Sequence, residues 1–430
     1  LSCTCFPSIH VYGGMSPWMT YCRITLDTDF YPQILIPNLQ LISTFLRLRN
    51  CRQKCRDLKS NNFLGPLDWG KALESIVVLT ISCIAEFANR RSEQLLPSHE
   101  MAVESARIFD MDCYYQTLIF ARRISGMGGT HMLKKINLTD PNQSEDIKLP
   151  SNTKAVKDLH VSPCGRLVLL ASMGKKLSII SMGCNKVVIS YSLPGPAWSC
   201  SWDPNSSHYM YAGLQNGMLL VFDMRQTVHP VQSINGLSSR PIHTIHSFEH
   251  KPTLCHGASL LTASAIGPCV PFLLPELDYQ GMCTSLAYSP SSDDIVATYC
   301  PKIQMSKETG SSQPHLPAVL GQEALSSQIH VKRVAGSFYQ KLESASTHVG
   351  NFFLAKSAII NVENCLPMFA YGDDVTCGLT LRDLPSLIVS HILKPHQHPI
   401  RDVKYTHSKG SSLPGCISDD KLQLFSAKFL

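Results

Sequence analysis

Short runs of alternating apolar and polar residues, separated by turn-forming residues, recur along most of this chain. Residues 157–182 match residues 198–223 in pattern at a shift of about 41 positions, so that Asp158–Pro163 falls on Ser199–Pro204. Both segments contain three short predicted strands divided by turns. A unit of this length and composition is typical of one blade of a WD40-type β-propeller.

The same pattern continues from about residue 102 to the C-terminus and predicts seven units. Outside the matched pair, the predicted strands are Ala106–Asp110, Leu118–Ala121 and His131–Ile136; Ile242–Ser247 and Ser259–Ser264; Ser285–Pro290, Ile295–Tyr299 and Gln328–Val334; Ser357–Val362, Met368–Tyr371 and Leu379–Asp383; and Arg401–Tyr405, Gly415–Ser418 and Leu422–Ser426. We therefore expect an all-β fold, a WD40-type β-propeller of seven blades preceded by a poorly defined N-terminal segment.

The clearest single signal is the segment Tyr211–Asp223, which is typical of a β-hairpin. Asn216 and Gly217 lie between alternating apolar residues, and this dipeptide favours a type I′ turn in which both residues have positive φ. Phe222 and Asp223 stand where a stronger repeat has its Trp-Asp pair. The alternative, a hairpin of some other β-sandwich, does not explain the repeat at about 41 residues.

Composition agrees with one large repeat domain and a smaller segment. The chain has 430 residues, of which 44% are hydrophobic and 16% charged, so it can bury a sizeable core. Its net charge of +6 is spread along the sequence and fits a nuclear protein or an acidic partner. No run of Lys and Arg is dense enough to predict direct contact with nucleic acid, and no apolar run is long enough to predict a membrane span.

The blade pattern also sets the expected domain boundaries. Residues 1–85 do not follow it, residues 86–101 are predicted to be a linker, and residues 102–430 are predicted to form the propeller. A polar insert at about 302–327 is expected as a loop of the fifth blade. The chain begins at Leu1 rather than Met, so we expect a fragment or an incomplete gene product.

The 17 cysteines do not predict a metal site or a disulfide framework. Most lie in apolar strands, where a free thiol behaves as a small buried hydrophobe, and this favours a reducing compartment. The N-terminal segment holds a scattered set of candidate zinc ligands: Cys3, Cys5, His10, Cys22, Cys51 and Cys55. Their spacing does not match the paired ligands of structural zinc sites, so we expect no metal and no cofactor in this chain.

Several residues are candidates for binding a partner, whereas none is a candidate for catalysis. No Ser, His or Asp has the spacing that orients a nucleophile against a base. Strand alternation places positions 198, 200 and 202 on one face, which predicts that Trp198 and Trp202 lie together in the core between blades. Arg225 and Arg401 are expected near the blade rims, where exposed arginines often anchor interfaces.

Four more residues complete the set of candidates. Asp158 and Asp402 each precede an apolar core residue by one position, and together with Asn216 and Gly217 they are predicted to stabilise blade turns. Asp223 and Arg225 also match a short Asp-x-Arg motif through which some propellers bind the adaptor of a cullin ligase. The predicted partner-binding residues are thus Trp198, Trp202, Asp223, Arg225 and Arg401.

Four short sequence motifs are more specific than the propeller fold requires. Val156–Pro163, Trp198–Trp202, Tyr211–Gly217 and Val221–Arg225 resemble the C-terminal propeller of the RING finger and WD repeat domain protein 3 family, in a plant-like version. The resemblance extends from about Ser105 to the end of the chain.

That family consists of RING-type E3 ubiquitin ligases that act in the nucleus at damaged or stalled DNA and support interstrand cross-link repair. The resemblance implies a location in the nucleus, with the cytoplasm as a second one. It also implies protein partners, namely replication protein A, substrates to be ubiquitinated and, with an intact RING, an E2 enzyme. Zinc would be expected only of an intact family RING.

The N-terminal segment departs from the family plan. Ile9–Gly13 resembles a phrase of the family's RING, and Cys51–Cys55 resembles a damaged version of its closing cysteines, but no heptad-rich coiled coil follows. We expect a truncated or mis-spliced product that carries a RING remnant, and whether this chain is itself an enzyme stays open. Two alternatives remain: a RING-less substrate receptor that binds a cullin adaptor through Asp223 and Arg225, and a non-enzymatic WD40 scaffold.

Overall fold

The computed structural model describes ten stretches of the chain, namely residues 94–124, 131–248, 260–270, 272–273, 281–301, 325–335, 338–347, 354–362, 366–408 and 411–428. The chain divides into two compact units, residues 1–87 and residues 88–430, and every described residue belongs to the second. The predicted N-terminal segment 1–85 with its candidate zinc ligands lies outside the described residues, and so do residues 302–324 of the predicted insert.

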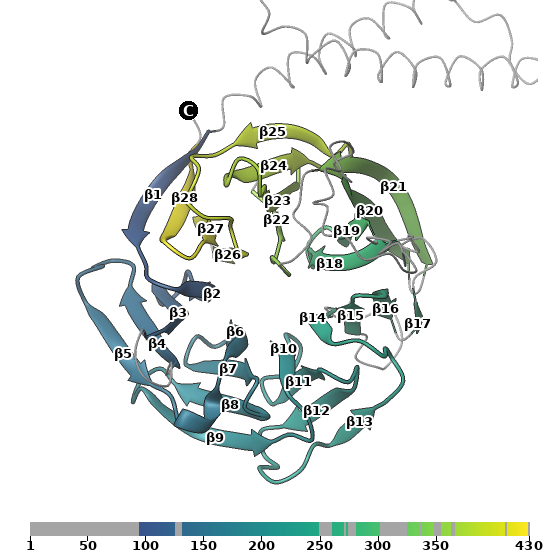
Figure 1. Cartoon of the computed structure of the whole chain (residues 1–430). Helices are drawn as coiled ribbons and strands as arrows, with labels where there is room; N and C mark the ends of the chain where they lie inside the picture. The colour runs from purple at the N-terminus through teal and green to yellow at the C-terminus, as the bar shows by residue number, and fades with distance from the viewer. Residues whose placement is uncertain are drawn as a thin grey trace, which may run out of the picture. The chain divides into compact units, whose positions relative to one another are not determined.

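Seven four-stranded antiparallel sheets stand side by side in a closed ring (Figure 1). The predicted all-β propeller with seven blades is therefore confirmed. We number the blades one to seven in chain order and list the strands of each from the inside of the ring outward. The strands of the first four blades are β2 (Ala106–Asp112), β3 (Thr117–Arg123), β4 (His131–Asn137) and β5 (Ser144–Lys148); β6 (Val156–Val161), β7 (Leu167–Ser172), β8 (Lys176–Ser181) and β9 (Lys186–Ser192); β10 (Ala197–Trp202), β11 (Tyr209–Leu214), β12 (Leu219–Asp223) and β13 (Gln232–Ile234); and β14 (Ile242–Ser247), β15 (Leu260–Ser264), β16 (Gly267–Val270) and β17 (Phe272–Leu273). Those of the last three are β18 (Gly281–Tyr288), β19 (Asp294–Pro301), β20 (Ser326–Ala335) and β21 (Phe338–Thr347); β22 (Ala358–Ile360), β23 (Met368–Gly372), β24 (Leu379–Asp383) and β25 (Ile388–Ile392); and β26 (Asp402–Ser408), β27 (Ser411–Ile417), β28 (Lys421–Lys428) and β1 (Gln94–Ala102).

The two ends of the propeller meet in blade seven (Figure 1). β1 pairs antiparallel with β28 along its whole length, from Gln94 opposite Lys428 to Ala102 opposite Lys421. The prediction that residues 86–101 form a linker is therefore wrong for residues 94–101. β1 is an edge strand that contains Pro97 beside a bulge, and an edge position tolerates such residues without an alternating apolar pattern. β1 is held in place by pairing with β28, a strand that is distant in sequence.

The sequence predicts three strands in six of the blades and two in the fourth, whereas each observed blade has four. The outermost strand was missed in every blade, and in the fourth blade β16 was missed as well. Burial explains why outermost strands were missed. β5 and β13 expose most of their side chains, and β25 buries none of its five. Such strands carry little apolar periodicity, which is the property that identifies a strand from sequence.

Apolar side chains fill the layers between neighbouring blades. Between blades two and three, Leu169 and Tyr191 belong to the same buried cluster as Trp202 and Phe222, with the Tyr191 and Phe222 rings 4.6 Å apart between centroids. The Trp202 Nε1–H also donates a hydrogen bond to the His160 carbonyl of blade two (3.0 Å). Trp202 therefore joins two blades, as the prediction of a core role requires.

Carboxylates on the innermost strands link one blade to the next. Asp402 Oδ2 of blade seven accepts a hydrogen bond from the Phe109 N–H of blade one (3.2 Å). Asp110 Oδ2 of blade one accepts from the Val161 N–H of blade two (2.7 Å), and Asp158 Oδ2 of blade two accepts from the Cys200 N–H of blade three (3.0 Å). The prediction that Asp158 and Asp402 stabilise turns is therefore wrong, because both residues lie in strands and hold neighbouring blades together.

The turn between β11 and β12 lies at the predicted dipeptide but has a different geometry. Gly217 has φ +78°, whereas Asn216 is not among the residues with positive φ, so the turn is not type I′. The Gly217 N–H donates to the Leu214 carbonyl (3.1 Å), and the Asn216 side-chain oxygen accepts from the Met218 N–H (3.3 Å). This is a type I turn followed by a glycine in the left-handed region, a common hairpin connection.

Candidate functional site

The innermost strands of five consecutive blades share a β-bulge near their first residue. The register irregularities fall at Arg107, Lys157, Trp198, His243 and Thr284, on β2, β6, β10, β14 and β18. A bulge places two residues of one strand opposite one residue of its partner and redirects a side chain out of the regular alternation. The side chain at this position of successive blades can therefore face the central axis of the ring instead of packing in the layer between blades.

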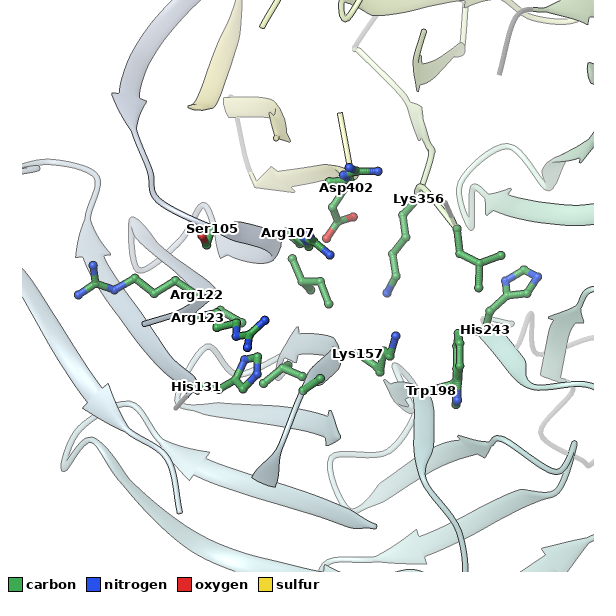
Figure 2. A pocket seen from close by; sticks show the side chains of 16 residues that line it. Ser105, Arg107, Arg122, Arg123, His131, Lys157, Trp198, His243, Lys356 and Asp402 are labelled. Carbon is green, nitrogen blue, oxygen red and sulfur yellow. The ribbon is translucent and has the colours of Figure 1, made fainter. Parts of the chain in front are cut away.

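Four of these five bulge residues line one cavity of about 480 Å³ at the end of the axis where the innermost strands begin. We call this cavity the basic mouth. In Figure 2, Arg107, Lys157 and Lys356 extend their charged ends into it, and Trp198 and His243 form one of its walls. Its lining comes from blades one to four, six and seven, so almost the whole ring contributes to one space.

Positive charge dominates the basic mouth. Its described lining residues include six lysines and arginines and one aspartate, Asp402. Four of the six cations have acidic partners: Arg107 and Arg401 share Asp419, with their nearest N to O distances at 2.8 and 3.3 Å, while Arg122 pairs with Asp146 and Lys356 with Asp158. The other two, Arg123 and Lys157, have no carboxylate within ion-pair distance in the described part of the chain.

Lys157 is held against Trp198 instead of an acid. Its Nζ lies 4.3 Å from the centroid of the indole ring, a cation–π contact. Burial and the nearby charge of Arg107 lower the pKa of Lys157. The Trp198 Nε1 is buried and has no hydrogen-bond partner, which is uncommon for an indole N–H. An anion that approached Lys157 would therefore relieve an uncompensated positive charge.

Asp402, the aspartate among the described lining residues of the mouth, is a weaker acid than an ordinary aspartate because its surroundings raise its pKa. Asp402 is fully buried, and burial raises its pKa to about 6 even though Lys404 and Lys356 oppose that change. Its Oδ1 has no hydrogen-bond partner, while its Oδ2 is used by Phe109. Below about pH 6 this carboxyl therefore loses its negative charge, at a pH where an ordinary surface aspartate stays ionised.

A second cavity, of about 570 Å³, lies further along the innermost strands and differs in charge. Its lining holds Asp110, Asp158 and Asp402 together with Lys356 and Lys404. Acidic and basic residues are nearly balanced there, so this end of the axis has no strong preference for an anion.

Asp158 lies at the centre of the charged groups between the two cavities. Burial alone would raise its pKa, but the charges of Lys356 and His160 outweigh that effect and hold the pKa well below its usual range. Lys356 of the segment before β22 reaches across the axis to pair with it, and the His160 Nε2 lies 3.4 Å from its Oδ1. This pairing links blade six to blade two, on nearly opposite sides of the ring.

The structure separates the two predicted tryptophans. Trp202 lies in the core between blades two and three, whereas Trp198 lines the basic mouth. The prediction that the indoles lie together is wrong, because the bulge between Ala197 and Ser199 breaks the alternation on which it depended. Trp198 is thus available to a ligand, and Trp202 is a structural residue.

Arg401 and Arg225 lie on opposite faces of the propeller. Arg401 lines the basic mouth with only 12% of its side chain exposed, so the prediction of an exposed rim residue is wrong for it. Arg225 follows the end of β12, which runs parallel to β10 and so ends on the face opposite the mouth. Its side chain is 62% exposed, and its Nη2 donates to Asp223 Oδ2 (2.6 Å). Asp223 is buried, and these hydrogen bonds from Arg225 lower its pKa to about 2.

Sequence reasoning missed most of the basic mouth. Arg107, Lys157, His243 and Lys356 were not among the candidates, although the first three occupy the same bulge position of the innermost strands. The signal is present in the repeats, because Lys157, Trp198 and Arg401 each stand one residue before the polar position that precedes a core residue. Aligning this position over all blades would have grouped the cations.

The described residues contain no group of three or more His, Cys, Asp or Glu side chains that could hold a metal ion. No helix in the described ranges is long and apolar enough to cross a membrane.

Comparisons with known proteins agree with this architecture. The family model of the E3 ubiquitin-protein ligase RFWD3 WD40 domain matches residues 98–426. The E3 ubiquitin-protein ligase RFWD3 of Homo sapiens is 35% identical over 104 residues, which are 24% of this chain and 13% of that protein. Its counterpart from Ailuropoda melanoleuca is 34% identical over 98 residues, or 23% of this chain and 13% of that protein. The matched stretches thus span about one eighth of the relatives' length.

The fold is also similar to that of a chain of known structure. A chain in a structure titled "Crystal Structure of Mitotic Checkpoint Complex" aligns with a TM-score of 0.54 over 78% of this chain and 92% of that chain. The two are 9% identical, so this likeness concerns the fold alone.

Proposed function

Because the chain belongs to the WD40-domain family of the E3 ubiquitin-protein ligase RFWD3, we propose that its propeller is the partner-binding part of a ubiquitin ligase. It captures proteins at damaged or stalled DNA in the nucleus, replication protein A among them, and so serves interstrand cross-link repair. The observation that carries the proposal is the family match over residues 98–426, which covers nearly the whole propeller.

The geometry supports a binding role over a catalytic one. The basic mouth gathers side chains from six blades around a space large enough for a short peptide segment. It contains no nucleophile oriented against a base among the described residues, and its charged groups are arranged to attract a ligand. Ubiquitin transfer would then be the work of the RING of such a ligase, with zinc and an E2 enzyme, while the propeller brings the substrate.

The test combines capture and transfer. The full chain is immobilised and exposed to purified replication protein A, and in parallel it is incubated with E1, an E2 enzyme, ubiquitin, ATP and zinc. We expect replication protein A to be retained. Ubiquitin chains would show that the N-terminal segment works as a RING, whereas capture without transfer would assign this chain the recruiting role alone. If replication protein A is not retained, the proposed partner is wrong.

One observation favours a second candidate function. The Arg225 guanidinium is largely exposed, and Asp223 fixes it on the face opposite the basic mouth. A fixed, exposed arginine suits docking to an acidic surface, so the propeller is a candidate receptor that borrows a cullin ligase through this face. Retention of the cullin adaptor by the wild-type chain, and its loss in Arg225→Ala with the basic mouth intact, would support this function.

A further inference from the structure

We propose that the basic mouth binds an acidic protein segment, a short run of Asp and Glu around one apolar residue, through Lys157, Arg123 and Trp198. The inference rests on the proposed function and names the class of partner sequence that it would recognise. Its basis is the combination of a cavity, an excess of positive charge within it, and an indole without a hydrogen-bond partner.

The charges identify an anion as the occupant. Arg107, Lys356 and Arg401 each pair with an acid of the propeller itself, Arg107 and Arg401 with the same one, Asp419. Among the described residues, Lys157 and Arg123 have no such acidic partner. Arg123 is exposed at the end of β3, and Lys157 is half-buried beside Trp198. The carboxylates of one acidic segment could each gain a charge-assisted hydrogen bond, one at Arg123 and one at Lys157, without breaking an existing ion pair.

The apolar surface within the basic mouth favours a peptide as the anionic occupant. Ile108, Leu354 and the Trp198 ring line the cavity together with the cations, and Leu354 is 38% exposed. A volume of about 480 Å³ holds a few amino-acid residues, so an apolar side chain can fill the wall side while its acidic neighbours contact the cations. The Trp198 N–H is a donor for which a backbone carbonyl of such a segment is a suitable acceptor.

The same features disfavour single-stranded nucleic acid. Such strands are bound along a groove of cations with several aromatic platforms for successive bases. Among the described residues, the lining of the basic mouth contains one tryptophan and no phenylalanine or tyrosine, and the Lys157 ammonium already lies over the indole. The cations surround one cavity of about 480 Å³, which suits a short segment better than a continuous strand.

The experiment measures binding of fluorescent peptides to the full chain by anisotropy. One peptide carries Asp and Glu around a Phe, the second carries Asn and Gln in their place, and a single-stranded oligonucleotide serves as a competitor. The variants are Lys157→Met, which keeps the apolar stem over the indole, and Arg123→Gln. The matched control is Lys186→Met, an exposed lysine on the outermost strand β9.

We expect the acidic peptide to bind and the neutral one to bind at least tenfold more weakly. Each mouth variant should weaken acidic-peptide binding by about tenfold, the factor that matches the lower end of the free energy of a hydrogen bond to a charged group. Lys186→Met should leave the affinity unchanged, and added salt should weaken binding because Arg123 is exposed.

Equal binding of the two peptides, no effect of both mouth variants, or preferential binding of the oligonucleotide would each overturn the inference. Its failure can be distinguished from failure of the proposed function. If replication protein A is retained but the acidic peptide is not, the partner-binding role stands and the mouth is not its site. If the acidic peptide binds with the expected pattern but replication protein A is not retained, the mouth is correctly assigned and the proposed partner is wrong.

Discussion

Replacing Asp158 with alanine tests whether the innermost strands are held together by charge and hydrogen bonds across blades. Asp158 is 1% exposed. Its Oδ2 accepts the Cys200 N–H of blade three (3.0 Å), its Oδ1 accepts the Leu159 N–H (2.9 Å), and the carboxylate pairs with Lys356 of the segment before β22. Alanine would leave two backbone donors and one ammonium without these partners.

The expected loss follows from these contacts. An orphaned buried donor costs about 1–3 kcal/mol, and breaking a buried ion pair costs about 3–5 kcal/mol. The Lys356 side chain is 21% exposed and can turn toward water in the basic mouth, so the terms do not add in full. We expect a loss of about 3–5 kcal/mol, which for a domain spanning residues 98–426 corresponds to a fall in Tm of about 4–7 °C.

Urea denaturation of the full chain, followed by circular dichroism, measures the loss. The matched control is Asp146→Ala, because Asp146 is 46% exposed and pairs with Arg122 (3.2 Å), and we expect it to cost less than about 1 kcal/mol. A double-mutant cycle with Lys356→Met isolates the ion pair, and its coupling free energy should be about 1–3 kcal/mol. A loss from Asp158→Ala no greater than that of the control, or additive effects in the cycle, would refute the reasoning.

Three further predictions follow from the fold. Gly217→Ala should lower stability by about 1–3 kcal/mol in urea denaturation, because Gly217 has φ +78° and an added Cβ would lie 1.8 Å from the Ser238 carbonyl oxygen; a loss no greater than that of Asn216→Ala would contradict this. Trp202→Phe should cost about 1–2 kcal/mol, since it removes the hydrogen bond to the His160 carbonyl between two blades, and Trp198→Phe, whose N–H has no partner, serves as its control in thermal denaturation. The free energy of unfolding should fall by about 1.4 kcal/mol per pH unit as the pH is lowered from 6 to 4.5. Burial lowers the pKa of His243 and His246 to about 4, so unfolding in this range takes up about two protons at these histidines. Burial raises the pKa of Asp402 to about 6, so unfolding releases about one proton there, and the net uptake is about one proton. Urea midpoints that stay constant or rise over this range would show that these groups do not control the acid limb.

The parts of the fold that were predictable share one property, a buried strand with apolar periodicity. β7, β11 and β19 bury nearly every side chain, and the repeat at about 41 residues makes their order recognisable. β1 and β13 have no such pattern, because an edge strand is ordered mainly by the backbone of its partner. Ring closure by β1 therefore depends on a contact between the two ends of the propeller, which a local pattern does not contain.

The candidate site was harder to predict because its residues are displaced from the strand period. Alternation correctly places Cys200 and Trp202 in the core, and it fails at Trp198, where the strand bulges against β11. A bulge is a property of two paired strands, so a single strand read alone does not reveal it. Arg225 was correctly predicted to be exposed, because it follows the end of a strand and its exposure does not depend on the pairing register of that strand.

The bulge divides two tasks between adjacent residues. In blade two, Lys157 lines the basic mouth, and the next residue, Asp158, bonds to blade three. In blade three, Trp198 lines the mouth while the Ser199 hydroxyl donates to the Ile242 carbonyl of blade four (2.7 Å). Because one residue faces the ligand space and its neighbour holds the ring, substitutions at adjacent positions should separate the two properties. Lys157→Met should weaken binding while the unfolding midpoint stays close to that of the wild-type chain, and Asp158→Ala should lower that midpoint. If both variants changed stability equally, the mouth would be part of the structural core and its cations would not be available to a partner.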